Sequence, residues 1–270
     1  MRMAGHWVHD LDPYLIHFPS SWPFAGIHWY GVAYALAFSL ALALAHLCAA
    51  KDRLPIARRD VDRWLGALCL GVLAGGRLGY FVLYERSTLV HDPLELFRIW
   101  HGGMASHGGF VGVALALFFL SRRRRISLLS LADLSAAAAP IGFFLGRLGN
   151  FINGEVYGRP TALPWGIIFP RSAPHAQFPL ALLPPRHPSQ LYEALLEGIV
   201  LLALTQWRLW TRRGRPGQLT GEFFIAYALL RSLAEFLREP DAPLILHLTA
   251  GQFYSIPLAV AGIAILCRGR

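Results

Sequence analysis

Seven apolar runs, each near the length of a membrane-crossing helix, constrain this chain more than any other feature. A helix needs about 20 predominantly apolar residues to cross a bilayer. With 55% hydrophobic and only 15% charged residues among 270, the chain is too apolar for a soluble domain. We expect an all-α integral membrane protein of about seven transmembrane helices, folded as one polytopic membrane domain over residues 1–270. The expected spans are residues 28–50, 64–84, 131–148, 188–207, 219–237 and 251–267, with one more that begins in residues 101–109 and ends near residue 121.

Two segments outside these runs are expected to be irregular. Residues 1–27 mix Trp, Tyr, His and Pro with Asp10 and Asp12, which suits an interfacial arm along the lipid head groups. They lack a charged stretch followed by an unbroken apolar one, so they do not resemble a cleaved signal. Residues 156–187 are rich in proline and aromatic residues and too long for a simple connector, which predicts a functional loop region.

The placement of charge predicts the orientation of the chain. The formal net charge is +9, and most of the 25 lysines and arginines follow the first, third, fifth and seventh runs. Basic residues in short loops are typical of the cytoplasmic side and argue against a nucleic-acid partner. We therefore expect the N-terminus and residues 156–187 to be periplasmic and the C-terminus cytoplasmic.

The stretch GRLGNFINGEVYG, residues 146–158, puts Arg147, Asn150, Asn153 and Glu155 at the outer end of an apolar run. An unpaired arginine in lipid is costly, so such residues usually mark a site. In a helix Arg147 and Asn150 share a face, and the neighbouring glycines would allow a backbone or ligand to approach closely. These glycines are Gly142, Gly146 and Gly149. The alternative is that the glycines only pack helices and Arg147 only reaches toward the head groups.

Two further stripes of polar residues fall in outer halves of apolar runs. They are Tyr227, Arg231 and Glu235 at i, i+4 and i+8, and Gln190, Glu193 and Glu197 at i, i+3 and i+7. Two arginines directed at one outer cavity, Arg147 and Arg231, are what a phosphate-bearing lipid head group requires. The alternative is that Glu235 only neutralises Arg231 and that Glu193 or Glu197 offsets Arg77.

Histidine offers a proton acceptor on the same side. His107 lies in the glycine-rich segment HGGMASHGG, residues 101–109, where we expect a broken or re-entrant beginning of the third span. An imidazole accepts a proton near neutral pH, while His28 and His187 are expected to support it by hydrogen bonding. The chain has no HExxH, GxSxG or Walker motif, and its three cysteines have no zinc spacing.

Residues 146–158 resemble the signature of the bacterial prolipoprotein diacylglyceryl transferases, G-R-x-G-N-F-x-N-x-E-x-x-G, at every fixed position. Other motifs resemble that family in order along nearly the whole chain. They are HWYG at 28–31, GGRLGY at 75–80, GGMASHGG at 102–109, RHPSQLYE at 186–193 and the series Arg231, Glu235 and Arg238. One position departs from the family pattern, because His101 stands before the first Gly-Gly where the family more often has an acidic or polar residue.

The resemblance implies a seven-span enzyme of the inner membrane that moves the diacylglyceryl group of phosphatidylglycerol to the lipobox cysteine of a prolipoprotein. A thioether forms and glycerol phosphate leaves, as the first step of bacterial lipoprotein maturation. No metal or nucleotide cofactor is implied. Arg147 and Arg231 would hold the phosphate, and His107 would take the thiol proton. The residues that would bind and orient the lipid are His28, Tyr30, Tyr84, Asn150, Asn153, Glu155, Gly158, Glu193, Tyr227 and Glu235.

A lipid transporter or flippase with an outer head-group site is the alternative function. Broken glycine-rich segments and membrane arginines occur there too, and GRLG recurs at residues 76–79 and 146–149. Four shared residues are too few to establish a duplication. The polar residues also gather on one side, which favours a one-sided site.

Overall fold

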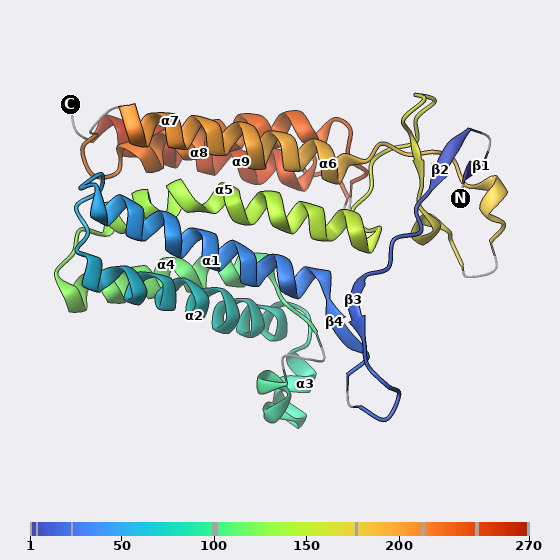
Figure 1. Cartoon of the computed structure of the whole chain (residues 1–270), viewed down its shortest axis with the longest axis horizontal. Helices are drawn as coiled ribbons and strands as arrows, with labels where there is room; N and C mark the ends of the chain where they lie inside the picture. Colours follow the sequence, from blue (N-terminus) through green and yellow to red (C-terminus); the bar gives the residue numbers. More distant parts are fainter. Residues whose placement is uncertain are drawn as a thin grey trace. The chain divides into compact units, whose positions relative to one another are not determined.

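The computed structural model describes residues 2–3, 5–22, 24–98, 102–175, 178–211, 214–240 and 243–268. It is mostly helical, as Figure 1 shows, and it divides into two compact units. Unit 1 comprises Met1–Ala41 and Ala136–Arg270, and unit 2 comprises Leu42–Ser135. His101 lies outside the described residues, and so do three of the basic residues used to predict orientation, Arg212, Arg213 and Arg270.

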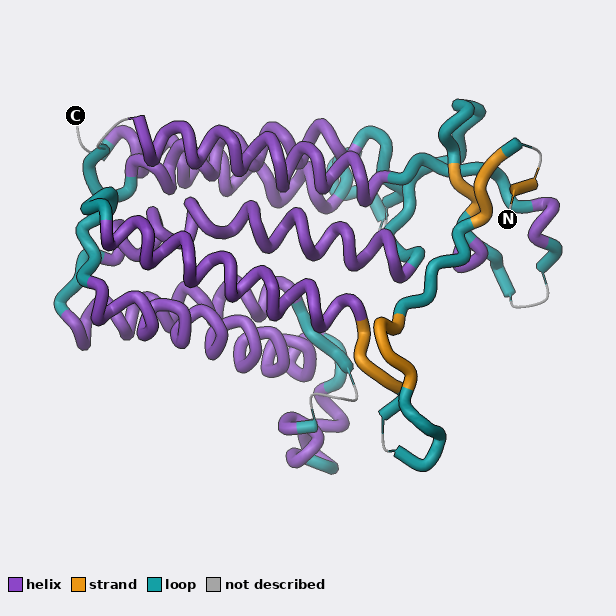
Figure 2. The backbone as a smooth tube through the Cα atoms, viewed as in Figure 1, coloured by secondary structure: helices purple, strands orange, loops and turns teal. Residues whose placement is uncertain are grey.

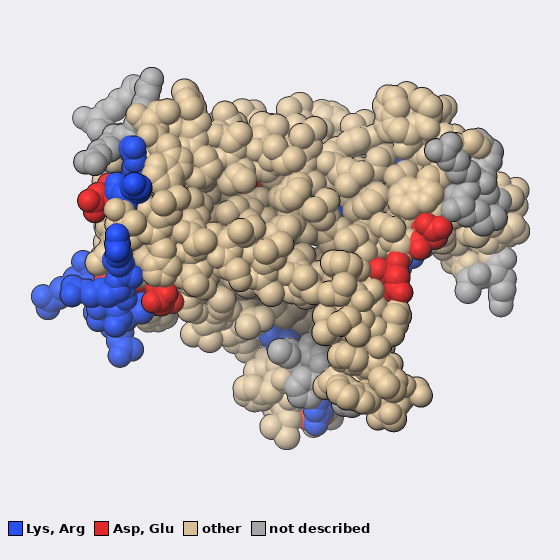
Figure 3. All heavy atoms as spheres, in the orientation of Figure 1, with Lys and Arg blue, Asp and Glu red and all other residues tan. Residues whose placement is uncertain are grey.

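Four helices in the described part of the chain are long and apolar enough to cross a membrane. They are α1 (Trp29–Ala50), α2 (Arg58–Leu83), α5 (Leu128–Asn153) and α9 (Ala250–Cys267). Each contains an apolar run identified in the sequence, although α2 begins six residues before the expected Trp64. Its first turns are polar, and the buried Asp60 within them pairs with two basic side chains. Asp60 Oδ1 lies 3.1 Å from Arg63 Nη1 and 3.0 Å from Arg124 Nε. Figure 3 draws all lysine and arginine side chains in blue, and some of them gather in clusters on the visible face.

Unit 1 continues after α5 with a long helix in three parts and then α8. The parts are α6 (Ser189–Glu193), the π-helical segment η5 (Ala194–Val200) and α7 (Leu201–Thr211). Helix α8 (Gln218–Glu235) packs against α9, where a Cβ at Gly262 would lie 2.7 Å from the Gly221 carbonyl oxygen. A capping box between Thr249 and Gln252 begins α9. Figure 1 shows these helices side by side.

Unit 2 is held together by glycines on two helices, α2 and α4 (Ser106–Arg124). A Cβ at Gly79 would lie 2.5 Å from Gly108 Cα, and one at Gly75 would lie 2.7 Å from Gly112 Cα. Only glycine permits backbones to approach so closely. Residues 102–105 are not helical and α4 begins at Ser106, so the break expected at the beginning of the third span lies before this helix. Gly108 and Gly109 are helical because this packing offsets their poor helix propensity.

Arg77 of α2 holds the segment that precedes α4. Its N–H groups donate to the main-chain carbonyls of Glu95, Leu96, Arg98, Gly102 and Gly103. Its Nη2 also lies 3.6 Å from the carboxylate of Glu95. The alternative that Glu193 or Glu197 offsets Arg77 is wrong, since the short helices α3 (Arg86–His91) and η1 (Pro93–Phe97) bring Glu95 to it.

Residues 1–27 and 156–187 are less irregular than expected. Strands β1 (Arg2–Met3), β2 (His6–Val8) and β5 (Ile167–Ile168) form a small sheet in which β2 runs parallel to β5. Strands β3 (Tyr14–His17) and β4 (Gly26–His28) pair separately, and the 3-10 turns η3 (Pro170–Ser172) and η4 (Leu180–Leu182) follow β5. Val8, Ile168 and Leu183 are buried together. The two segments thus share a small core, and Figure 2 shows its strands in orange.

Candidate functional site

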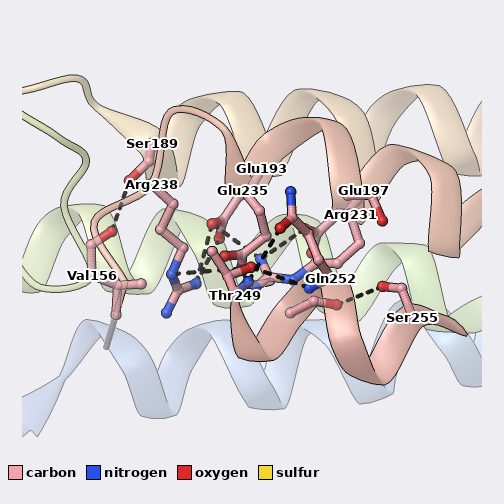
Figure 4. Close-up of polar contacts among 12 residues, drawn as sticks. Val156, Ser189, Glu193, Glu197, Arg231, Glu235, Arg238, Thr249, Gln252 and Ser255 are labelled. Carbon is pink, nitrogen blue, oxygen red and sulfur yellow. Dashed lines mark hydrogen bonds and ion pairs between the residues drawn. The ribbon is translucent and has the colours of Figure 1, made fainter. Parts of the chain in front are cut away.

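Three arginines and three glutamates form a continuous ion-pair network among the described residues of unit 1. Arg147 belongs to α5, Glu193 to α6 and Glu197 to η5, while Arg231 and Glu235 belong to α8 and Arg238 follows it. Figure 4 shows most of them pointing toward one another between the helices. With every side chain ionised, the charges of the network cancel.

Glu193 lies at the centre of the network. Its Oε2 is 2.7 Å from Arg147 Nε, and its Oε1 is 3.1 Å from Nη1 of both Arg231 and Arg238. Its side chain is 0% exposed. A carboxylate so deeply buried is stable only when it is paired, and here three guanidinium groups pair it.

The other two glutamates each reach two arginines. Glu197 Oε2 lies 3.4 Å from Arg147 Nη2, and its Oε1 lies 3.0 Å from Arg231 Nη1. Glu235 pairs with Arg231 one turn away and lies 4.0 Å from Arg238 Nε. Helical spacing of four residues accounts for the Arg231–Glu235 pair, which the sequence predicted.

The signature turn after α5 is tied to the same helices. Asn150 and Asn153 donate from Nδ2 to Glu155 Oε1 over 2.9 and 3.2 Å. Gln190 donates to the Glu155 carbonyl over 2.6 Å, and Ser189 donates to the Val156 carbonyl over 2.9 Å. The three polar residues predicted from the signature therefore lie together, beside the start of the helix that carries Glu193.

Gly158 has a structural reason to be glycine. Its N–H donates to the His187 carbonyl over 2.9 Å, and a Cβ there would lie 2.5 Å from the Leu237 carbonyl oxygen. Gly158 also forms an isolated β-bridge with Arg238. This close pairing places Arg238 in the network.

Of the three predicted aromatic residues of unit 1, Tyr30 and Tyr227 contact α5, whereas His28 lies in the paired strands β3 and β4. The Tyr30 ring packs on Gly149, where a Cβ would lie 2.6 Å from Tyr30 Cδ2. Tyr227 lies one turn before Arg231, with its ring centroid 5.1 Å from that of Phe143. The His28 ring is 4.0 Å from that of Tyr14 in the paired strands β3 and β4.

Two predicted site residues belong to unit 2. His107 is the second residue of α4, and its side chain lies outside the described residues. Tyr84 ends α2, with an exposed ring 5.9 Å from that of Tyr80.

The alternative in which Arg147 only reaches toward head groups does not fit, because its side chain is 20% exposed and paired with buried Glu193. The alternative that the glycines of α5 only pack helices does not fit at Gly142 and Gly146. Among the described residues, no heavy atom would lie within 4 Å of a Cβ at either position. At Gly149 a tyrosine ring, not a backbone, makes the close contact.

The N-terminal segment reaches the end of α5 through His9. Its Nε2 lies 2.6 Å from the Phe151 carbonyl oxygen, and its ring stacks on Phe169 at 5.3 Å. His9 is 7% exposed, and burial lowers its pKa below the ordinary 6.5. Burial likewise lowers the pKa of His187.

The predicted site did not include two members of the network, Glu197 and Arg238. The spacing of both residues in the sequence could have identified them. Glu197 is seven residues after Gln190 in one polar stripe, and Arg238 is three residues after Glu235. Helical spacing placed Glu197 on the right face. Arg238 lies beyond the end of α8, where helical spacing no longer predicts direction.

The chain is similar in sequence to one family over almost its whole length. The family model described as prolipoprotein diacylglyceryl transferase matches residues 18–268. A relative from Rhodospirillum rubrum, named phosphatidylglycerol–prolipoprotein diacylglyceryl transferase, is 43% identical over 267 residues, covering 96% of this chain and 93% of the relative. Relatives of the same name from Cereibacter sphaeroides and Nitrosomonas europaea are 41% and 45% identical, covering 90% and 89% of this chain and 91% and 84% of the relatives.

Proposed function

The chain belongs to the prolipoprotein diacylglyceryl transferase family, and we propose that it transfers the diacylglyceryl group of phosphatidylglycerol to a prolipoprotein cysteine. Apart from the sequence similarity, the observation that supports this proposal is the arginine–glutamate network of unit 1. A lipid phosphate needs guanidinium groups fixed in an apolar setting, and two helices supply them here. The transporter alternative is not favoured, since the relatives compared are named as transferases.

The reaction joins sulfur to carbon and releases a phosphate. The cysteine thiolate attacks the terminal glyceryl carbon that bears the phosphate ester, and an S–C bond forms as the C–O bond breaks. The bonding pair leaves with the phosphate oxygen, so the product is glycerol phosphate. Arg147 and Arg231 would stabilise the negative charge that grows on this oxygen. Glu193 and Glu235 orient the two arginines through the ion pairs described above.

The remaining site residues keep roles that the sequence predicted. Asn150, Asn153 and Glu155 would contact the glycerol head group, since their polar atoms lie together beside the network. Roles in binding lipid for His28, Tyr30, Tyr84, Gly158 and Tyr227 remain part of the proposal. His107 would take the thiol proton, because a cysteine with a pKa of about 8.5 is mostly protonated at neutral pH.

We also propose that this multi-pass membrane protein crosses the inner membrane seven times as a single domain, residues 1–270. The three further spans would be α4, the continuous helix α6–η5–α7, and α8, whose lengths and apolar composition support this. The arginine-rich loops favour a periplasmic N-terminus, a periplasmic region at residues 156–187 and a cytoplasmic C-terminus.

A transfer assay with purified protein in detergent tests the function. Phosphatidylglycerol and a short lipobox peptide are supplied, and the peptide mass is measured. We expect a gain of one diacylglyceryl group, lost in Arg147→Ala and in His107→Gln. Arg208→Ala is the matched control, because Arg208 is paired with Glu222 at 2.5 Å elsewhere in unit 1. Absence of transfer by the folded wild-type protein would contradict the proposal, and full activity of Arg147→Ala would remove the phosphate role.

A further inference from the structure

The two arginines proposed to bind phosphate are already neutralised in the structure. Arg147 contacts Glu193 and Glu197, and Arg231 contacts those two glutamates and Glu235. An anion that enters must compete with a carboxylate for the same N–H donors. The affinity of the site for a phosphate therefore depends on which carboxylate the phosphate displaces from the arginines.

Glu197 holds Arg147 less firmly than Glu193 does, while the two carboxylates lie at similar distances from Arg231, 3.0 and 3.1 Å. Its contact with Arg147 is 3.4 Å, against 2.7 Å for the contact of Glu193 with the same arginine. Glu193 also binds a third arginine, Arg238. Glu235 is bound to Arg231 from one turn away on the same helix, so it remains beside that arginine whatever else enters.

The position of the Glu197 carboxylate also matches that of a bound phosphate. One of its oxygens faces Arg147 and the other faces Arg231, so a single anionic group joins the two guanidinium groups. A phosphodiester has two anionic oxygens and can join the same two groups in the same way. Arg147 is the most exposed member of this trio, at 20% against 11% for Arg231 and 1% for Glu197, so the lipid phosphate approaches from its side.

The local backbone lets the side chain move while the helix stays in place. Glu197 lies in the π-helical segment η5, and π turns inside helices recur at functional sites. The next residue, Gly198, packs tightly on α5, where a Cβ would lie 2.7 Å from Phe144 Cβ and 2.9 Å from Phe144 Cα. This contact fixes η5 against α5, so exchange at the arginines involves rotation of the Glu197 side chain.

We propose that Glu197 is an exchange carboxylate, which the phosphate of phosphatidylglycerol displaces from Arg147 and Arg231 and which returns to them when glycerol phosphate leaves. This inference rests on the proposed function. Two unpaired buried arginines would bind substrate and phosphate product alike, which would slow product release without helping the chemical step. A competing carboxylate weakens the binding of both the lipid substrate and the phosphate product, and it keeps the arginines paired between turnovers.

The test compares Glu197→Gln and Glu197→Asp with the wild-type protein. Gln keeps the shape of the Glu197 side chain and removes its charge, so the phosphate no longer competes with this carboxylate for the two arginines. Asp keeps the charge, is shorter by one methylene and cannot join both arginines. We expect phosphatidylglycerol, measured without acceptor peptide, to bind about tenfold tighter to Glu197→Gln than to wild type, with Glu197→Asp between them. The inhibition constant of glycerol phosphate should fall in the same order.

Steady-state kinetics provide a second readout that a purely structural role would not produce. We expect KM for phosphatidylglycerol to fall in both variants while kcat does not rise, because the phosphate product is retained. Glu222→Gln is the matched control, since Glu222 is the carboxylate of the separate Arg208 pair, and it should leave the affinity unchanged. If Glu197→Gln fails to fold, Glu197→Asp, which keeps the charge, decides the question.

Weaker or unchanged binding of both phosphatidylglycerol and glycerol phosphate by the folded variants would overturn the inference. This result is distinct from failure of the proposed function, in which the wild-type protein itself transfers no diacylglyceryl group. A wild type that transfers, with variants that do not bind more tightly, leaves the function intact and removes only the exchange role.

Discussion

Arg147 Nε lies 2.7 Å from Glu193 Oε2, and this ion pair joins α5 to α6 at a point where Glu193 is fully buried. The same carboxylate also holds Arg231 and Arg238, so one side chain sets the positions of three guanidinium groups. The proposed phosphate site therefore depends on Glu193 for its geometry.

Replacing Glu193 by Gln should damage both stability and transfer. Removing one partner of a buried charge network costs about 3–5 kcal/mol, because the remaining charges stay buried without compensation. Misplacement of the arginines should lower kcat roughly 100-fold. Thermal unfolding in detergent and the transfer assay measure the two effects. Glu222→Gln should cost less, since Glu222 is 29% exposed; equal losses in the two variants would contradict the central role of Glu193.

Replacing Arg77 by Lys should loosen the segment between α2 and α4. Lysine has three donors on one nitrogen, so at least two of the carbonyls that Arg77 binds would lose their partner, at roughly 1–3 kcal/mol for each buried group. Hydrogen exchange of residues 93–98 and 102–105 should accelerate. Arg98→Gln is the control, because the Arg98 side chain is 37% exposed and pairs only with Asp92 and Glu95 among the described contacts. Unchanged exchange in Arg77→Lys would show that the carbonyls are held by other groups.

Replacing Gly79 by Leu should separate α2 from α4, because a Cβ at Gly79 already lies 2.5 Å from Gly108 Cα. Such overpacking costs about 1–3 kcal/mol or more, seen as a lower Tm. Gly66→Ala on the same helix is the control, since among the described residues no atom lies within 4 Å of a Cβ there. Alanine should raise helix stability at that position by up to about 1 kcal/mol. Similar shifts for both variants would mean that the glycine contacts do not hold the helices together.

Acidification should weaken the packing of the N-terminal segment through His9. Burial lowers its pKa below 6.5 in the folded protein, so the unfolded chain takes up the proton first as the pH falls. The contribution of His9 to stability is thus present above pH 6.5 and is lost as the pH falls through the folded pKa. We expect Tm to drop between pH 7.5 and pH 5.5, roughly the window around an ordinary histidine pKa, and to drop less in His9→Gln. An identical pH profile for that variant would assign the loss to other groups, including His187.

The sequence by itself determined which long apolar helices form and which charged neighbours share a helix face. Apolar length predicted α1, α2, α5 and α9, because crossing a bilayer is a requirement on length and composition alone. Helical spacing placed Arg231 beside Glu235 and Glu193 on the face of Glu197, since neighbours on one helix follow from its period.

Only the tertiary structure decided which charges meet between helices. Arg77 pairs with Glu95 and not with Glu193 or Glu197, and Arg238 joins the network through the pairing of Gly158 with the segment after α8. Gly108 is helical because Gly79 lies against it, although its own propensity opposes a helix. Strand β2 pairs with β5 across most of the chain. Such choices depend on which surfaces pack together, and the periodicity of a single segment does not contain that information.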